Sequence, residues 1–321
     1  MEVLRLEVFR YSLTPLQAPN RLSAAAARSG VLLRVHFRDL PLPGHADLFP
    51  WPELGDEALA FQLDALKSGT PCALGASSLA WAYYEARARA EGRALLNDAD
   101  YVSHTTLVDR TQKPGPLAKL KVTASDLTDP SSLVGFFDHY PETRWRLDFN
   151  GLLETEESAK KFWAAFSTEH RSRIDWLEDP FTETLMRDPK AIAVFRGTPV
   201  ALDRGVLPLI LPHVQTWVVK PVYFSPDYLF AQVSAFQGHV AFTSNMDHPL
   251  GQLIALHVAQ RAQTQHPKKV IAGGLLTHDL YSPHAHSAWV TQSRSCLKAR
   301  TQGAGWGLAE KLDPLSWEPL A

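Results

Sequence analysis

The sequence predicts an α/β protein in which a β/α barrel follows a smaller α+β module. The chain has 321 residues, of which 45% are hydrophobic, and this is enough for one barrel-sized unit and a second small domain. From about residue 100 onward, short apolar strand-like runs alternate with helical patterns, whereas before that point strands precede helices. About eight strands in such an alternation favour a closed barrel over an open sheet.

The first part of the chain has the pattern of a separate α+β module. Residues 2–13 and 31–37 have the pattern of strands, and helical patterns follow around residues 57–68 and 78–92. The connection 14–30 is rich in Pro, Ala and Ser. We expect this connection to lie over the mouth of the barrel as a lid, because the ends of a barrel alone leave a site open to water.

The second part of the chain is predicted to be the barrel. Its strand-like runs are 101–108, 117–122, 144–149, 174–178, 199–203, 216–220, 239–244 and 270–273. Helical patterns between them are clearest at 129–140, 154–172, 226–237 and 249–264, whereas 178–198 and 204–215 are weak as helices. The stretch from about 285 to 321 has no barrel pattern, and we expect it to pack back on the N-terminal module.

Charge and cysteine usage exclude several classes of function. The formal net charge is −2, with both signs interspersed, so the sequence indicates neither a nucleic-acid groove nor a basic membrane-binding face. Cys72 and Cys296 lie far apart, without the spacing of a zinc site or a disulfide framework, which fits a reducing cytoplasm. The N-terminus lacks the apolar core of a signal peptide, and no apolar run reaches the length of a membrane span. Small-molecule chemistry is therefore the expected function.

Two lysines share one face of a predicted barrel strand. Lys119 and Lys121 are two residues apart in the run 117–122, and residues so spaced on a strand point the same way. Like charges so placed repel, and a fold tolerates this where function or a compensating anion requires it. A solvated pair on an edge strand is the simple alternative, and the charged residues on later strands argue against it.

Three carboxylates end three successive strands of the predicted barrel. Asp148, Glu178 and Asp203 are separated by 30 and 25 residues, about one β/α unit each, so we expect them side by side at the barrel mouth, where the chemistry of this fold lies. A single carboxylate after a strand is usually a turn or cap residue, but three in series are not. Three hard oxygen ligands suit Mg²⁺. Lys220 ends the sixth strand, across the barrel from the lysine pair.

This motif set resembles that of the muconate-lactonizing subgroup of the enolase superfamily and, within it, the o-succinylbenzoate synthase family. The local sequences that carry the resemblance are 146–150, 176–180, 218–221, 244–251 and 274–280. The resemblance implies a modified (β/α)7β TIM-like barrel with an N-terminal α+β capping domain. The implied boundaries are 1–97 for the capping domain, 98–284 for the barrel and 285–321 for a C-terminal segment that completes the capping domain.

The resemblance also implies a reaction and a role for each charged residue. The reaction is the syn-dehydration of 2-succinyl-6-hydroxy-2,4-cyclohexadiene-1-carboxylate to o-succinylbenzoate in menaquinone biosynthesis. Lys121 would take the proton and return it to the departing hydroxyl, Lys220 would stabilise the enediolate by its charge, and Lys119 would help to depress the pKa of the base. The implied ligands of Mg²⁺, or alternatively Mn²⁺, are Asp148, Glu178 and Asp203.

Four residues near the strand ends are candidates for substrate binding. Thr243 and Ser244 end the seventh strand and Gly274 follows the eighth, where backbone N–H groups could hold the succinyl carboxylate. Asn150 would orient a ligand or cap the next helix. Turn chemistry is the alternative for each of them. One departure from the family pattern is Arg204, where many relatives have an acidic residue after the third ligand.

Two other functions remain open from the sequence. The same fold and metal would serve an N-acylamino acid racemase or a dipeptide epimerase, in which Lys121 and Lys220 act as two opposed bases. A barrel that binds a ligand without turnover is the alternative outside enzymes, but unused buried charges are costly to keep in a core. We expect a small carboxylate as the partner, with no nucleic acid and no membrane. The oligomeric state is left open.

Overall fold

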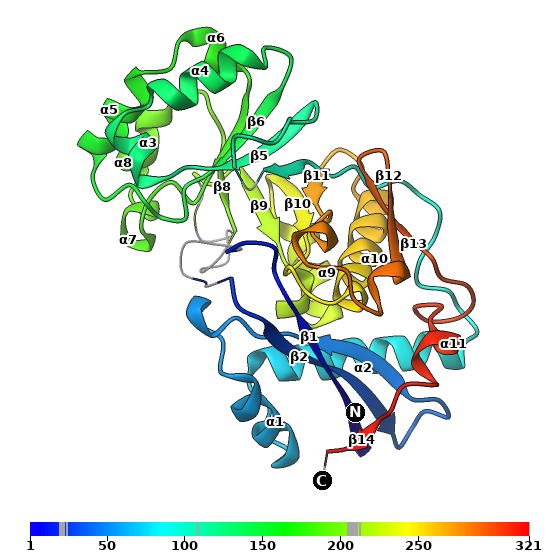
Figure 1. The fold of residues 1–321 in the computed structure, drawn as a ribbon. Coiled ribbons are helices and arrows are strands. Elements are labelled where there is room, and N and C mark those ends of the chain that lie inside the picture. The colour runs from blue at the N-terminus through cyan, green and yellow to red at the C-terminus, as the bar shows by residue number, and fades with distance from the viewer. Residues whose placement is uncertain (19–22, 24, 108, 204–210, 212, 321) are drawn as a thin grey trace.

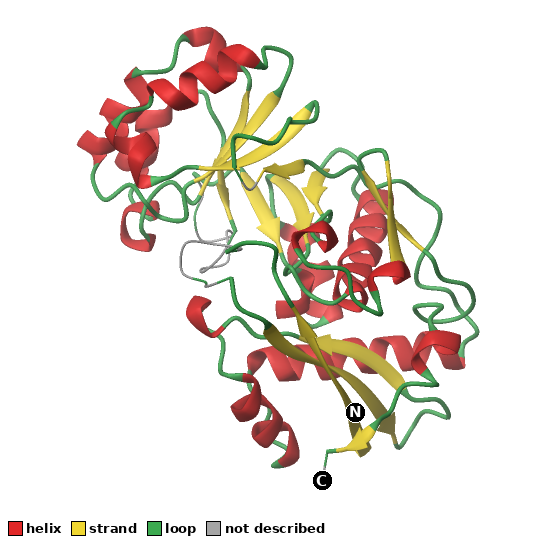
Figure 2. Cartoon of the chain, viewed as in Figure 1, coloured by secondary structure: helices red, strands yellow, loops and turns green. Residues whose placement is uncertain are grey.

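The computed structural model describes residues 1–18, 23, 25–107, 109–203, 211 and 213–320. In these residues the strands form an eight-stranded parallel sheet, a four-stranded antiparallel sheet and a two-stranded hairpin (Figure 1). Helices cover the outside of the parallel sheet, and one long helix lies along the antiparallel sheet (Figure 2). This is the fold class that the sequence predicts. No helix of the described ranges is long and apolar enough to cross a membrane.

The antiparallel sheet joins the two ends of the chain. Its strands, in spatial order, are β14 (Glu318–Pro319), β1 (Val3–Leu13), β2 (Arg28–Phe37) and β3 (Gly44–Leu48). The elements that follow β3 are η1 (Pro52–Leu54), α1 (Leu59–Lys67) and α2 (Ala73–Ala90). We call this sheet with its helices the cap. Because Glu7 pairs with Pro319, the C-terminal segment contributes a strand to the cap.

Strand β3 is absent from the sequence prediction. All five of its residues are buried, so it lacks the alternation that marks a half-buried strand. A Cβ on Gly44 would lie 1.8 Å from the carbonyl oxygen of Ala82 in α2. Glycine at this position therefore lets α2 lie directly against β3. Helix α2 also begins at Ala73, five residues before the predicted start.

The eight parallel strands coincide with the eight runs predicted from the sequence. They are β4 (Thr105–Leu107), β5 (Leu117–Lys121), β6 (Arg144–Asp148), β7 (Ile174–Glu178), β8 (Val200–Leu202), β9 (Thr216–Val219), β10 (His239–Thr243) and β11 (Val270–Gly274). Each strand pairs with the next one in sequence. Ser103 pairs with Gly273, and His104 N donates to Gly273 O at 2.8 Å. These contacts join the first strand to the last and close the barrel.

Helices of three to 17 residues connect the barrel strands. They are α3 (Ala124–Thr128), α4 (Ser131–His139), α5 (Glu156–Ala164), α6 (Thr168–Ser172), α7 (Glu183–Met186), α8 (Pro189–Ile192), η2 (Ala193–Phe195), η4 (Pro221–Tyr223), α9 (Pro226–Ala235) and α10 (Pro249–Gln265). The single helix predicted at 154–172 is in fact two, because the hydroxyl of Ser167 accepts a hydrogen bond from His170 N and starts a new helix. The C-terminal elements are η5 (His278–Leu280), η6 (Ser287–Trp289), β12 (Val290–Ser293), β13 (Cys296–Ala299) and α11 (Ala309–Leu312).

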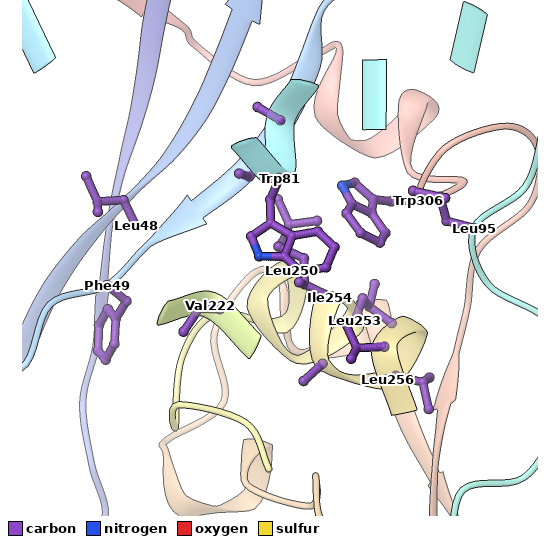
Figure 3. Close-up of a cluster of buried hydrophobic side chains, with 14 of the residues drawn as sticks. Leu48, Phe49, Trp81, Leu95, Val222, Leu250, Leu253, Ile254, Leu256 and Trp306 are labelled. Carbon is purple, nitrogen blue, oxygen red and sulfur yellow. The ribbon is translucent and has the colours of Figure 1, made fainter. Parts of the chain in front are cut away.

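One hydrophobic core runs from the cap into the barrel. Trp81 of α2 packs beside Leu250 and Ile254 of α10 (Figure 3). Its indole N–H donates to Pro221 O at 3.2 Å, and that of Trp51 donates to Asn245 O at 2.9 Å. A buried indole N–H needs a partner, so these tryptophans fix the cap against the strand ends of β9 and β10.

Candidate active site

The first three charged positions lie side by side at the barrel mouth. Lys121, Asp148 and Glu178 are the last residues of β5, β6 and β7. The register pairs Lys121 with Asp148, and Asp148 with Glu178. Asp203 directly follows β8 and Lys220 directly follows β9. Because β9 lies four strands from β5 in the eight-stranded barrel, the structure places Lys220 opposite the lysine pair.

The ammonium group of Lys119 lies between two of the carboxylates. Its Nζ is 2.5 Å from Glu178 Oε1 and 3.0 Å from Asp148 Oδ2. All three side chains are largely buried, with 14%, 1% and 8% of the side-chain surface exposed for Lys119, Glu178 and Asp148. On the far side, Lys220 forms an ion pair with Asp203. Each predicted ligand therefore has an ammonium group against it.

The carboxylates and the lysines of the site shift one another's pKa values. Burial raises the pKa of Glu178, and the charges of Asp148 and Asp203 raise it further, while Lys119 opposes the shift. Burial lowers the pKa of Lys119, but the charges of Asp148, Glu178 and Asp203 outweigh this and raise it above its usual value. Lys119 is thus held as a cation and is unsuited to act as a base.

Lys121 is the lysine whose pKa moves in the direction a base requires. Burial lowers the pKa of Lys121, and the nearby ammonium groups of Lys119 and Lys220 lower it further. The charges of Asp148 and Glu178 oppose the shift. Lys121 therefore loses its proton more easily than an ordinary surface lysine does, and its neutral amine can act as a base.

Neighbouring side chains orient two of the carboxylates. Trp176 Nε1 donates to Glu178 Oε2 at 3.3 Å. Asn150 donates twice to Asp148 Oδ1, from Nδ2 at 2.8 Å and from its backbone N–H at 3.2 Å. These contacts favour an orienting role for Asn150, beside the substrate-binding role that its position suggested.

The other substrate-binding candidates lie where β10 and β11 end. Thr243 Oγ1 donates to Gly274 O at 2.8 Å, and the hydroxyl groups of Ser244 and Thr277 are 2.5 Å apart. The backbone N–H of Ser244 donates to Gly274 O at 3.3 Å. The backbone N–H of Ser244 is therefore already engaged within the barrel end, and so is the single hydroxyl proton of Thr243.

A buried arginine, Arg146, pairs with Lys119 in the strand register, and the sequence reasoning did not assign it a role. The guanidinium carbon of Arg146 lies 3.6 Å from the ring centroid of Trp176, and Arg146 Nη1 is 2.7 Å from Nδ1 of the buried His104. Asp175 Oδ2 accepts from Arg146 Nε at 3.2 Å. The signal in the sequence is the spacing, because Arg146 lies two residues before Asp148 and so shares its face of β6.

Two features expected from the sequence include residues outside the described ranges. Arg204 lies outside them, as do residues 19–22 and 24 of the predicted lid. Of the described flanks of the lid, Pro15 pairs with Tyr281, which follows the last barrel strand. Arg28 at the other flank makes two hydrogen bonds to Glu53, at 2.7 and 2.9 Å. The described flanks thus join the C-terminal side of the barrel to η1 of the cap.

Asp148, Glu178 and Asp203 offer carboxylate oxygens, which suit a hard divalent cation. In the described structure, each of these carboxylates contacts the ammonium group of a lysine. Within the described part of the chain, no three His, Cys, Asp or Glu side chains are arranged to hold a metal ion. However, Lys119 places a positive charge between Asp148 and Glu178, so the site already holds a cation on carboxylate oxygens. Carboxylate oxygens without nitrogen or sulfur ligands are the set that Mg²⁺ prefers.

Comparison with known proteins finds similarity over the whole chain. The model of the O-succinylbenzoate synthase N-terminal domain matches residues 6–88. A curated o-succinylbenzoate synthase from Bdellovibrio bacteriovorus is 31% identical, with 99% of each chain covered.

Solved structures share the fold at low sequence identity. A dipeptide epimerase from Cytophaga hutchinsonii, complexed with Mg and the dipeptide D-Ala-L-Val, has a TM-score of 0.79 at 15% identity, with 100% of both chains covered. An o-succinylbenzoate synthase from Thermosynechococcus elongatus BP-1, with Mg in its active site, has a TM-score of 0.65 at 18% identity and covers 88% of this chain and 96% of its own.

Proposed function

Because this chain belongs to the o-succinylbenzoate synthase family of the enolase superfamily, we propose that it dehydrates 2-succinyl-6-hydroxy-2,4-cyclohexadiene-1-carboxylate to o-succinylbenzoate, in menaquinone biosynthesis. The family is one of carbon–oxygen hydro-lyases. The reaction removes one proton and one hydroxide from neighbouring ring carbons and leaves an aromatic ring and water.

The observation that supports this function best is the placement of the lysines around the carboxylates. Lys121 ends β5 beside Asp148, and Lys220 lies four strands away against Asp203. A flat ring carboxylate bound between them would have one lysine at each face. One lysine can then take the α-proton from its own face, while the other places a positive charge at the opposite face.

We assign Lys121 as the base. It would take the α-proton of the substrate and then donate that proton to the departing hydroxyl on the same face, which releases water. Lys220 would place its positive charge near the carboxylate oxygens as negative charge develops there, and would move no proton. Lys119 would keep the pKa of Lys121 low by its fixed charge.

We further propose that Asp148, Glu178 and Asp203 hold Mg²⁺, or Mn²⁺ in its place. The bound ion would supply Lewis-acid stabilisation of the carboxylate of the substrate. For this, the ammonium group of Lys119 has to withdraw from Asp148 and Glu178, and Lys220 from Asp203. Thr243, Ser244 and Gly274 remain our candidates for the succinyl end of the substrate, through the side chains of Thr243 and Ser244 and the backbone of Gly274.

A second candidate function is favoured by the same opposed lysines. If Lys220 also exchanged protons, the site would racemise an N-acylamino acid or epimerise a dipeptide. The fold does not separate the two functions, because an epimerase and a synthase both share it. The experiment that tests the proposal is an assay of the purified protein with the cyclohexadiene substrate and Mg²⁺. Formation of o-succinylbenzoate supports it, and epimerisation of dipeptides without dehydration contradicts it.

We also propose that the protein works in the cytoplasm on a small carboxylate, without nucleic acid or a membrane as partner. Cys72 and Cys296 are both free thiols, which a reducing compartment preserves.

A further inference from the structure

Asp179 connects the three strand ends that carry the predicted metal ligands. Its backbone N–H donates to Ala201 O of β8 at 3.0 Å, and its carbonyl oxygen accepts from Gly151 N, after β6, at 2.7 Å. Its side chain Oδ1 accepts a hydrogen bond from the backbone N–H of Asp203 at 3.1 Å. Asp179 itself directly follows Glu178. One residue therefore contacts the segments that present Asp148, Glu178 and Asp203.

The backbone of Asp179 has the left-handed conformation, with φ of 42°. This conformation is uncommon for residues other than glycine, and Asn and Asp tolerate it best. It turns the chain out of β7 so that the carboxylate side chain of Asp179 points toward the end of β8. Asn150 shares the left-handed conformation, with φ of 49°, and donates to Asp148 from the end of β6. The same local geometry thus supports two of the three ligands.

We propose that Asp179 is a positioning residue of the metal site, which fixes Asp203 through the hydrogen bond from Asp203 N to Asp179 Oδ1. This inference rests on the proposed function, because it takes Asp203 as a ligand of Mg²⁺. Asp203 comes directly after the three-residue strand β8. The hydrogen bond to Asp179 is a side-chain contact that holds its backbone in the described structure.

The expected consequence concerns metal affinity. Residues that orient metal ligands contribute about 10- to 100-fold to affinity or activity. Without the acceptor at position 179, binding of the metal would have to order the backbone of Asp203. The conformational entropy lost in this step would weaken Mg²⁺ binding. Asp179 does not touch the substrate in this proposal, so its effect should appear in Mg²⁺ binding measured without substrate.

The test compares three substitutions in the full-length protein, titrated with Mg²⁺ alone by calorimetry and by the Mg²⁺-dependent rise of the unfolding temperature. Asp179→Ala removes the acceptor, and we expect it to weaken Mg²⁺ binding by about 10- to 100-fold. Asp179→Asn keeps an acceptor oxygen at the same place, and we expect it to stay within about threefold of the wild type. Asparagine also tolerates the left-handed backbone at this position, whereas alanine does not. Asp179→Gly removes the acceptor without this strain, so it should weaken Mg²⁺ binding as Asp179→Ala does.

Asp188→Ala is the matched control. Asp188 also accepts a hydrogen bond from a backbone N–H, that of Lys190 at 2.9 Å, but it caps helix α8 instead of a ligand segment. It should lower stability by about 1 kcal/mol and leave Mg²⁺ affinity unchanged. If the wild type binds Mg²⁺ and Asp179→Ala binds it equally well, or if Asp179→Asn is as weak as Asp179→Ala, the positioning role is wrong. If the wild type itself does not bind Mg²⁺, the metal assignment of the proposed function fails instead.

Discussion

Lys119 and Glu178 form a buried ion pair, with 2.5 Å between Nζ and Oε1. The pair lies at the barrel mouth, where the proposed metal would have to contact the same carboxylate. The ammonium group therefore competes with the metal for Glu178, and it also lies 3.0 Å from Asp148 Oδ2. This competition means that the charge of Lys119 should influence both metal binding and the base.

We predict that Lys119→Ala binds Mg²⁺ more tightly than the wild type does and yet turns over more slowly. Removal of the ammonium group frees Asp148 and Glu178 and removes a repulsive charge, so the affinity should rise by about tenfold, or about 1.4 kcal/mol. Turnover should fall because the base loses a charge that lowers its pKa. Calorimetric titration with Mg²⁺ measures the first effect. Lys160→Ala removes an exposed lysine that pairs with Glu156 and should change neither. Weaker Mg²⁺ binding by Lys119→Ala would contradict the placement of the metal.

Closure of the barrel should be sensitive to a single methyl group at Gly273. A Cβ there would lie 1.9 Å from Phe242 O and 2.4 Å from the hydroxyl of Tyr101. Because these are backbone and fully buried atoms, we expect Gly273→Ala to lower the free energy of unfolding by at least about 3 kcal/mol. Gly135 in α4 has no atom within 4 Å of its Cβ position, so Gly135→Ala should instead stabilise by about 0.5–1 kcal/mol. Urea unfolding of the two variants checks this pair, and equal effects would contradict it.

The barrel could be predicted because each of its strands has a local hydrophobic pattern. The cap strand β3 has no such pattern and could not be predicted. Runs such as 174–178 are apolar, short and separated by one β/α unit, which fixes both their type and their order. In β3 the buried polar residues His45 and Asp47 break any apolar pattern. Their partners come from distant segments: Tyr11 donates to Asp47 at 2.6 Å, and the His45 carbonyl oxygen accepts from Trp306 at 3.0 Å. No sequence window contains that information.

The placement of the charged side chains followed from the same rules, but their contacts did not. Parallel register puts the last residues of β5, β6 and β7 side by side, so the neighbourhood of Lys121, Asp148 and Glu178 was predictable. That Lys119 reaches between the carboxylates depends on side-chain length and local charge. The contact of Asp179 with Asp203 depends on the left-handed backbone of Asp179, which the hydrophobic periodicity of the sequence does not predict.

Two buried carboxyl groups face each other where the cap meets the barrel. A Cβ on Gly251 would lie 2.4 Å from Asp247 Oδ2 and 2.7 Å from Asp47 Oδ2, so both oxygens lie near one point. In the described structure neither of these oxygens has a hydrogen-bond partner. Burial raises the pKa of Asp247 to about 7, and burial with the charge of Asp247 raises the pKa of Asp47.

We predict that this pair makes the protein less stable as the pH rises. The folded state holds a proton that the unfolded state releases near pH 3.8, so the stabilisation is complete at acidic pH and is lost as the pH rises through about 7. Asp247→Asn replaces the carboxyl group with an uncharged amide, so it should flatten the pH dependence of the unfolding temperature between about pH 5 and about pH 8. Each unit of pKa shift corresponds to about 1.4 kcal/mol in the free energy of unfolding. Asp129→Asn, at an exposed carboxylate whose pKa is lowered, should leave it unchanged. If the unfolding temperature of the wild type rose with pH over this range, the folded state would not hold a proton on this pair.

Replacement of the proposed base should remove the reaction. Lys121→Ala has no amine to take the α-proton, so we expect dehydration to fall by about 10²- to 10⁴-fold or more. Mg²⁺ binding should be retained, which calorimetry can confirm, because Lys121 is not a proposed ligand. Near wild-type formation of o-succinylbenzoate by Lys121→Ala would rule out the one-base mechanism.

The opposite lysine separates a synthase from an epimerase. In the one-base dehydration Lys220 contributes only charge, and arginine supplies charge at a similar place, so Lys220→Arg should be impaired but measurable in the cyclohexadiene assay. Arginine stays protonated and cannot serve as a base. In a two-base epimerase the same substitution should therefore abolish isomerisation, while Lys121 still exchanges the α-proton on its own face with solvent deuterium. Measurement of both reactions on the one variant decides between the functions. Loss of dehydration as complete as in Lys121→Ala would show that Lys220 moves a proton, against the role assigned to it here.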